Sequence, residues 1–336
     1  MKAHVKERKN FLLFFAFVSV MFSANPVWAA LDPFDQVENV EVVAKGADSP
    51  VKFTAGLGAG YLSGDATELV YWPEAGNHKA SELTWEIDNL FMFNVNAEIS
   101  IHDWVKVKLD TWFKVTDGEG TLDDYDWQIV GGDWTDWSHH EDTDVSEAYM
   151  VDLSGEFAFY RSENAAFSAI LGYKADHFGW EARGGDYIYS VSGFRNSQGS
   201  FPDGLTGISY DQTYYSFYLG VGTELQFSKF KTEARLIYAP YVYGEATDNH
   251  HLRNLVTHET FDEFGDGNLL AIDISGSYFF TEQFSLGIGL RYQSYSTMTG
   301  DADWHYRNYG VVVSTDDGVG MDQTSTMIVT MLKYTF

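Results

Sequence analysis

Hydrophobic and polar residues alternate over long stretches of this chain. In the clearest stretch the odd positions from Phe91 to Ile101 are apolar, and the even positions include Asn94, Asn96 and Glu98. This period of two predicts β-strands with one apolar face. Ten such segments occur, at residues 51–61, 91–101, 105–115, 145–153, 167–173, 215–221, 236–238, 272–278, 284–290 and 328–336.

The connections between these segments alternate between short turns and long loops. Short turns are expected at 102–103, 162–165, 228–229 and 281–283, and long loops at 64–84, 117–144, 178–212, 244–268 and 297–324. In an up-and-down antiparallel arrangement all the long loops emerge at the same end. A soluble β-sandwich is the alternative, but its strands average about 5–6 residues and several here exceed ten. We therefore predict an all-β fold, a ten-stranded antiparallel transmembrane β-barrel with long extracellular loops.

The N-terminus has the composition of an export signal. Lys2, Lys6, Arg8 and Lys9 precede an apolar run, 11–22, that is too short to cross a membrane as a helix. Small residues follow, and cleavage after Ala29 fits them best. We expect a signal peptide at 1–29, a polar lead-in at 30–50 and a single barrel domain at 51–336.

The net charge of −28 and the absence of cysteine exclude several classes of site. Nucleic acid is an unfavourable partner for so acidic a chain, and disulfides, thiolate metal sites and cysteine nucleophiles are absent. The five predicted long loops hold 29 acidic and 5 basic residues. The negative charge is thus expected at one end of the barrel, where it would attract cationic partners.

Two short motifs in these loops pair chemically active groups. Asp124 and Asp126 are two residues apart, so in extended backbone they share one face and can hold a water or a proton between them. Asp248 and His250 have the same spacing, and a carboxylate beside an imidazole makes the imidazole a better general base. We expect the two pairs to face each other across the mouth of the barrel.

The segment 134–142 offers two other chemistries. Ser138 near a histidine could be a nucleophile, but no Gly-x-Ser-x-Gly turn surrounds it. The run from His139 to Asp142 could bind a metal, but adjacent histidines in a strand point to opposite faces. Both remain weaker alternatives.

Several motifs, in order along the chain, resemble the omptin family of outer-membrane proteases over about residues 51–336. They are Asp-x-Asp-Trp at 124–127, Trp-Thr-Asp-x-Ser-x-His at 134–140, Ala-Arg-Gly-Gly-x-Tyr-Ile-Tyr-Ser at 182–190, Gly-Phe-Arg at 193–195, Gly-Ser-Phe-Pro-x-Gly at 199–204, Asp-x-His at 248–250 and a terminal Lys-Tyr-Thr-Phe.

The resemblance implies an aspartyl-type endopeptidase with its active site in an extracellular groove. It implies that Asp124 and Asp126 bind the attacking water and that His250, oriented by Asp248, accepts its proton. It also implies cleavage next to basic residues. Substrate-binding roles are expected for Glu68, Asp136 and Ser138, and Glu68 matches a family acid that receives the basic side chain.

The chain also departs from the family pattern. Ala246 stands where the family often has a second specificity acid, two residues before Asp248. Of the family's lipopolysaccharide-binding positions Tyr173 matches, whereas Ala175, His177 and Leu225 replace charged residues. The resemblance therefore supports only in part a requirement of this protein for lipopolysaccharide. No other cofactor and no metal is expected.

We expect an outer-membrane endopeptidase of a Gram-negative bacterium. It should act as a monomer, facing outward, on basic peptides or proteins, with outer-membrane lipid around it. The alternative is a non-enzymatic adhesin or receptor that binds cationic partners through its acidic loops, and a phospholipase barrel using Ser138 is a third reading.

Overall fold

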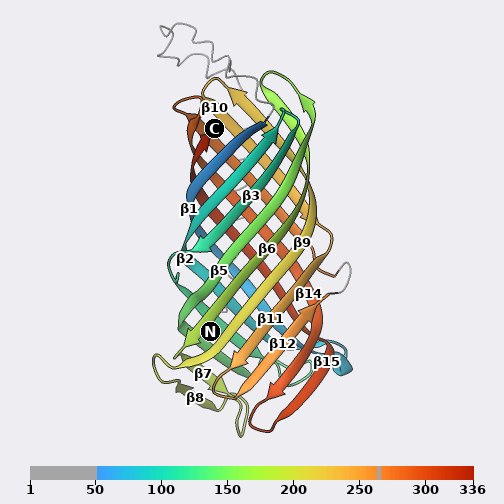
Figure 1. Ribbon diagram of the computed structural model, residues 1–336. Coiled ribbons are helices and arrows are strands. Elements are labelled where there is room, and N and C mark those ends of the chain that lie inside the picture. Colours follow the sequence, from blue (N-terminus) through green and yellow to red (C-terminus); the bar gives the residue numbers. More distant parts are fainter. Residues whose placement is uncertain (1–50, 263–265) are drawn as a thin grey trace. The chain divides into compact units, whose positions relative to one another are not determined.

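The computed structural model describes residues 51–262 and 266–336, which belong to one compact unit (Figure 1). The predicted signal peptide, 1–29, and lead-in, 30–50, lie outside the described residues. No helix in the described part of the chain is long and apolar enough to cross a membrane. The only helical turn assigned there is the short 3-10 turn η2, Pro73–Ala75.

All the remaining regular secondary structure of these residues is strand. The strands are β1 (Val51–Trp72), β2 (His78–Ile101), β3 (Val105–Lys114), β4 (Gly120–Asp126), β5 (Asp136–Arg161), β6 (Ala165–Arg183), β7 (Asp186–Tyr189), β8 (Ser197–Ser200), β9 (Thr206–Phe227), β10 (Phe230–Ala239), β11 (Val242–His250), β12 (Leu255–Phe261), β13 (Leu269–Phe279), β14 (Phe284–Tyr306) and β15 (Val311–Thr335).

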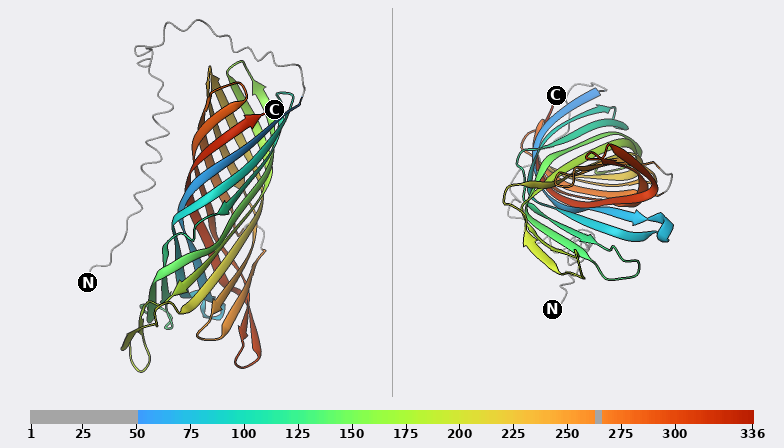
Figure 2. Two further views of the ribbon diagram at one scale, coloured as in Figure 1. Left: turned by 60° about the vertical axis from the view of Figure 1, so that its left-hand side comes forward. Right: turned by 90° about the horizontal axis from the view of Figure 1, so that it is seen from below.

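These strands close into a barrel. β1 pairs with β2 on one side and with β15, the last strand, on the other, and all the pairings are antiparallel. The first and last strands therefore meet in one sheet, which leaves no free edge between them (Figures 1 and 2). An all-β antiparallel fold, as the alternation predicts, is confirmed.

The described residues form fifteen strands rather than the ten that the sequence pattern predicts. Three pairs of short strands share neighbours: β3 and β4 both lie between β2 and β5, β10 and β11 both pair with β9, and β12 and β13 both pair with β14. The two remaining short strands, β7 and β8, form a hairpin on the edge of β5. One of these interruptions, between β10 and β11, contains Pro240, which has no backbone N–H to donate to the sheet.

The segments expected as long loops are largely strand, and this prediction is wrong for most of their length. The first of them, 64–84, consists of the ends of β1 and β2 joined by a turn at 73–77. Polar residues interrupt the apolar alternation there, but the strands continue because the outer face no longer needs to be apolar. The barrel wall is therefore taller than the alternation alone indicates.

Along β1 and β2 the outer surface of the barrel has two zones. Large apolar side chains are exposed at Phe53, Leu57, Phe91, Phe93, Val95, Val107, Leu109, Leu153, Leu171, Phe217, Leu219, Leu236, Leu286, Ile288, Ile328 and Leu332, which together we call the apolar belt. None of the exposed large apolar side chains lies between residues 58 and 90, where β1 and β2 continue beyond this belt. About ten further residues of strand extend each of them by roughly 30 Å along its own axis.

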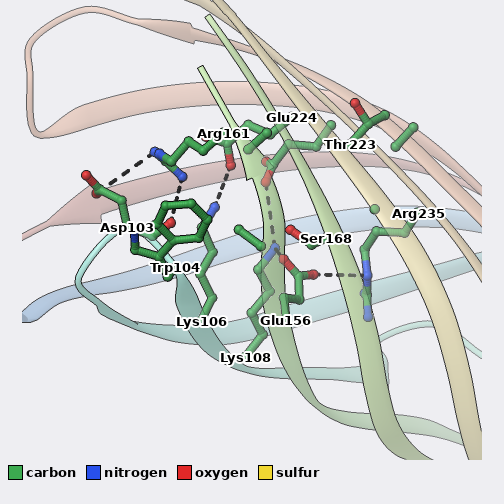
Figure 3. Close-up of a pocket in the computed structure, with 15 residues that line it drawn as sticks. Asp103, Trp104, Lys106, Lys108, Glu156, Arg161, Ser168, Thr223, Glu224 and Arg235 are labelled. Atoms are coloured by element: carbon green, nitrogen blue, oxygen red, sulfur yellow. Dashed lines mark hydrogen bonds and ion pairs between the residues drawn. The ribbon is translucent and has the colours of Figure 1, made fainter. Parts of the chain in front are cut away.

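Inside the belt the barrel interior is lined by ion pairs. Lys108 Nζ lies 3.0 Å from a Glu156 carboxylate oxygen, and Arg235 Nε lies 3.4 Å from the other. Figure 3 shows these side chains, with Lys106 and Glu224 in contact beside them. Acidic and basic groups thus neutralise each other in this part of the interior.

A further buried ion pair joins Lys174 and Asp176 on β6. Asp176 is fully buried and accepts hydrogen bonds from Lys174 Nζ at 2.8 Å, Tyr295 OH at 2.7 Å and Gln293 Nε2 at 3.1 Å. Removing one partner of a buried ion pair leaves an uncompensated charge.

We predict that Asp176→Ala lowers the free energy of unfolding by about 3–5 kcal/mol, because Lys174 is left charged and buried. Urea unfolding of the barrel in lipid vesicles measures this loss. The double variant Lys174→Met/Asp176→Ala should recover more than half of it. A double variant no more stable than Asp176→Ala would contradict the assignment.

Candidate active site

The Asp124–Asp126 pair lies on β4, which is held on both sides. Asp124 pairs with Leu83 on β2 and with Ser138 on β5, and Asp126 pairs with Ser81 and Asp136. The Ser81 hydroxyl is 3.4 Å from Asp124 Oδ1. Both carboxylates are therefore fixed by backbone ladders beyond the apolar belt.

Burial makes these carboxylates unusually hard to ionise. Asp124 is 6% exposed, and burial together with the neighbouring Asp126 raises its pKa to about 7. Burial also raises the pKa of Asp126, although the Arg253 guanidinium opposes the shift. Near neutral pH the pair can therefore retain a proton.

The second pair lies at the end of β11. Asp248 Oδ2 is 2.8 Å from His250 Nε2, and the two side chains are 3% and 12% exposed. Burial by itself lowers the pKa of His250, but the Asp248 carboxylate, with a smaller contribution from Asp124, opposes this, and the net shift is upward. The geometry suits a carboxylate that orients an imidazole.

The two pairs face each other across the interior. β5, β6 and β9 separate β4 from β11 around the wall, yet the charge on Asp124 acts on His250 and that on His250 acts on Asp124. Aromatic rings also cross the interior: Trp85 of β2 stacks on Tyr210 of β9, with centroids 5.6 Å apart. The ring centroid of Trp180 on β6 lies 6.0 Å from that of Trp85, and the three rings form an aromatic cluster.

Glu68 joins the first pair through the sheet register. Glu68 pairs with Leu83, Leu83 with Asp124, and Asp124 with Ser138, so one row crosses β1, β2, β4 and β5. All four side chains are buried. Glu68 and Asp248 also interact electrostatically, which places Glu68 near both pairs.

The two remaining predicted residues have local partners. Asp136 Oδ1 accepts a hydrogen bond from the Ser190 backbone N–H at 2.8 Å, which ties β5 to the segment after β7. Ser138 is 2% exposed, and its hydroxyl lies 3.2 Å from His140 Nε2. Ser138 thus stands beside Asp124, whereas Asp136 anchors a neighbouring segment.

The geometry gives little support to the two weaker chemistries of segment 134–142. Ser138 and His140 do come together, but none of the carboxylates in the described residues hydrogen-bonds His140 to orient it. Within residues 51–262 and 266–336 no group of three or more metal-ligating side chains is placed to hold a metal ion.

Three residues near the site were not identified as site residues from the sequence. Arg253 interacts with Asp124 and Asp126, and Tyr189 interacts with the same carboxylates. Glu259 is buried close to Asp248 and Glu68. The proximity of Arg253 to the Asp-x-His motif along the chain is a usable signal, but Glu259 is revealed only by strand register.

We predict that Asp124→Asn stabilises the fold at alkaline pH. The pKa of Asp124 rises from 3.8 to about 7 on folding, so its ionisation destabilises the folded state as pH rises through that range. The variant should gain up to about 4 kcal/mol at pH 8 and almost nothing at pH 4. Urea unfolding at both pH values measures this, with Glu163→Gln in an exposed turn as control. A less stable Asp124→Asn at pH 8 would be inconsistent with the buried acid pair.

Known proteins resemble this chain over nearly all of its described length. A model of the Omptin family matches residues 49–336. Outer membrane protease OmpP of Escherichia coli strain K12 is 28% identical over 291 residues, which cover 85% of this chain and 91% of that protein. Plasminogen activator of Yersinia pestis is also 28% identical, with 86% and 91% covered.

The fold agrees with this sequence similarity. The crystal structure of outer membrane protease OmpT from Escherichia coli matches with a TM-score of 0.81 at 25% identity, covering 86% of this chain and 98% of that chain. The resemblance noted from the motifs is confirmed over the barrel. The chain belongs to the omptin family.

Proposed function

We propose that this protein is an outer-membrane endopeptidase that cleaves peptide bonds next to basic residues. The observation that carries the proposal is the pair of acid-containing dyads, Asp124/Asp126 and Asp248/His250, held across one aromatic-lined interior. Relatives named as outer membrane proteases support it.

The proposed reaction uses water as the nucleophile. Asp124 and Asp126 hold the water, and His250, oriented by Asp248, takes its proton as the oxygen attacks the carbonyl carbon. The tetrahedral intermediate then collapses, and His250 passes the proton to the departing amine. No covalent enzyme intermediate forms. Ser138 is therefore not a nucleophile, and its proposed role is to bind the substrate.

The location follows from the two zones of the wall. The exposed apolar belt suits the hydrocarbon layer, and the extended strands carry the site beyond it. We propose a barrel with ten wall positions, in which β3 with β4, β10 with β11 and β13 with β12 each fill one position. Its extended end, with the connections there, faces outside the cell.

We predict that Asp126→Ala and His250→Ala each lower kcat/KM at least 100-fold, because a positioned base contributes about that much or more. Cleavage of a mixed peptide library by the refolded protein measures the loss. His251→Ala, at the exposed neighbour of His250, is the matched control. More than about a tenth of the activity surviving in either variant would refute the mechanism.

The pH profile gives a separate prediction. His250 must be neutral to accept a proton and its pKa is raised, so kcat/KM should rise with pH through a value above 6.5. Asp248→Asn removes the charge that stabilises the imidazolium, and we expect the acidic limb to move to lower pH while kcat falls. A limb that stays in place would show that it does not report the titration of His250.

A further inference from the structure

Two buried glutamates beside the proposed catalytic groups lack a positive partner among the residues that the structure describes. Glu68 is 2% exposed and Glu259 3%, and Glu68 Oε2 and both Glu259 carboxylate oxygens are buried without a hydrogen-bond partner. Among the ion pairs of the described residues none includes either side chain. A buried carboxylate of this kind stays protonated or binds a cation, because an isolated buried charge is unfavourable.

Strand register explains how Glu259 reaches the site. It pairs directly with Ala246, as Thr257 pairs with Asp248 on the same two strands. Its neighbours His258 and Thr260 are exposed, so Glu259 faces inward. Side chains opposite each other in such a pair have Cβ atoms about 4.5–5.5 Å apart, and the small side chain of Ala246 leaves room beside Glu259.

Electrostatic interactions place both glutamates in one cluster. Burial raises the pKa of Glu259, and Asp248 adds to the shift. Burial likewise raises the pKa of Glu68, with further contributions from Asp248, Glu259 and Asp124. The two carboxylates therefore lie close to each other and to Asp248, and Glu68 also lies close to Asp124.

The carboxylates of Glu68 and Glu259 indicate which kind of ligand this cluster can bind. A metal is not favoured, since the described residues place no metal-binding group of three or more ligands. In the barrel interior inside the apolar belt, by contrast, glutamates such as Glu156 form ion pairs with Lys108 and Arg235. The unmatched carboxylates beyond the belt fit a cationic side chain brought by the substrate, whose charge would favour their ionised form.

We propose that Glu259 is a specificity-determining residue that, together with Glu68, binds the basic side chain next to the cleaved bond. It supplies the carboxylate that Ala246 does not. This inference rests on the proposed endopeptidase function and assigns that function's charge preference to a particular residue.

The test compares matched peptides that contain arginine or its neutral analogue citrulline at the cleaved bond. We expect Glu259→Gln to lower kcat/KM for the arginine peptide about 10- to 100-fold, mainly through KM, because a charge-assisted contact is lost. The citrulline peptide should change less than about threefold, since it brings no charge to the site. Glu245→Gln, beside Ala246 on the exposed face, is the control and should behave as wild type.

A rescue variant separates binding from folding. Ala246→Asp combined with Glu259→Ala moves the carboxylate across the strand pair and should restore most of the arginine preference. Wild-type cleavage with an unchanged arginine-to-citrulline ratio in Glu259→Gln would overturn the inference alone. Failure of folded wild-type protein to cleave any peptide would overturn the proposed function, and the inference with it.

Discussion

Closure of the sheet is the constraint on which the rest of the structure depends. Backbone groups in a hydrocarbon layer must find partners within the protein, and the pairing of β1 with β15 supplies them where an open sheet would have two edges. Closure also fixes every register. Within this wall, the pairing of β1 with β2 and of β2 with β4 brings Glu68 and Asp124, far apart in sequence, into one row.

A closed wall gives the protein two different interiors. Inside the apolar belt, acids such as Glu156 are paired with bases. Beyond the belt, Asp124, Glu68 and Glu259 are buried with raised pKa values. That burial weakens the fold when the acids ionise, a loss of stability of the kind found where function needs a destabilised site.

Much of this arrangement could be predicted from the sequence. Alternation at Phe91–Ile101 identifies a strand with an outward apolar face, and the structure exposes Phe91, Phe93 and Val95 there. The i, i+2 spacing also places Asp248 and His250 together, at 2.8 Å. Both depend on local geometry that a short stretch of sequence contains.

The extent of the strands and the position of Glu259 could not be predicted in the same way. Residues 64–84 lack clear alternation, because beyond the belt both faces of the wall can be polar, so strand and loop have similar sequences. Glu259 approaches Asp248 only through its pairing with Ala246, which no local pattern encodes. Glu259 on β12 can take the place of an acid at position 246 on β11, because the two positions are paired. The strength of an electrostatic interaction depends on where the carboxylate lies and not on which strand carries it.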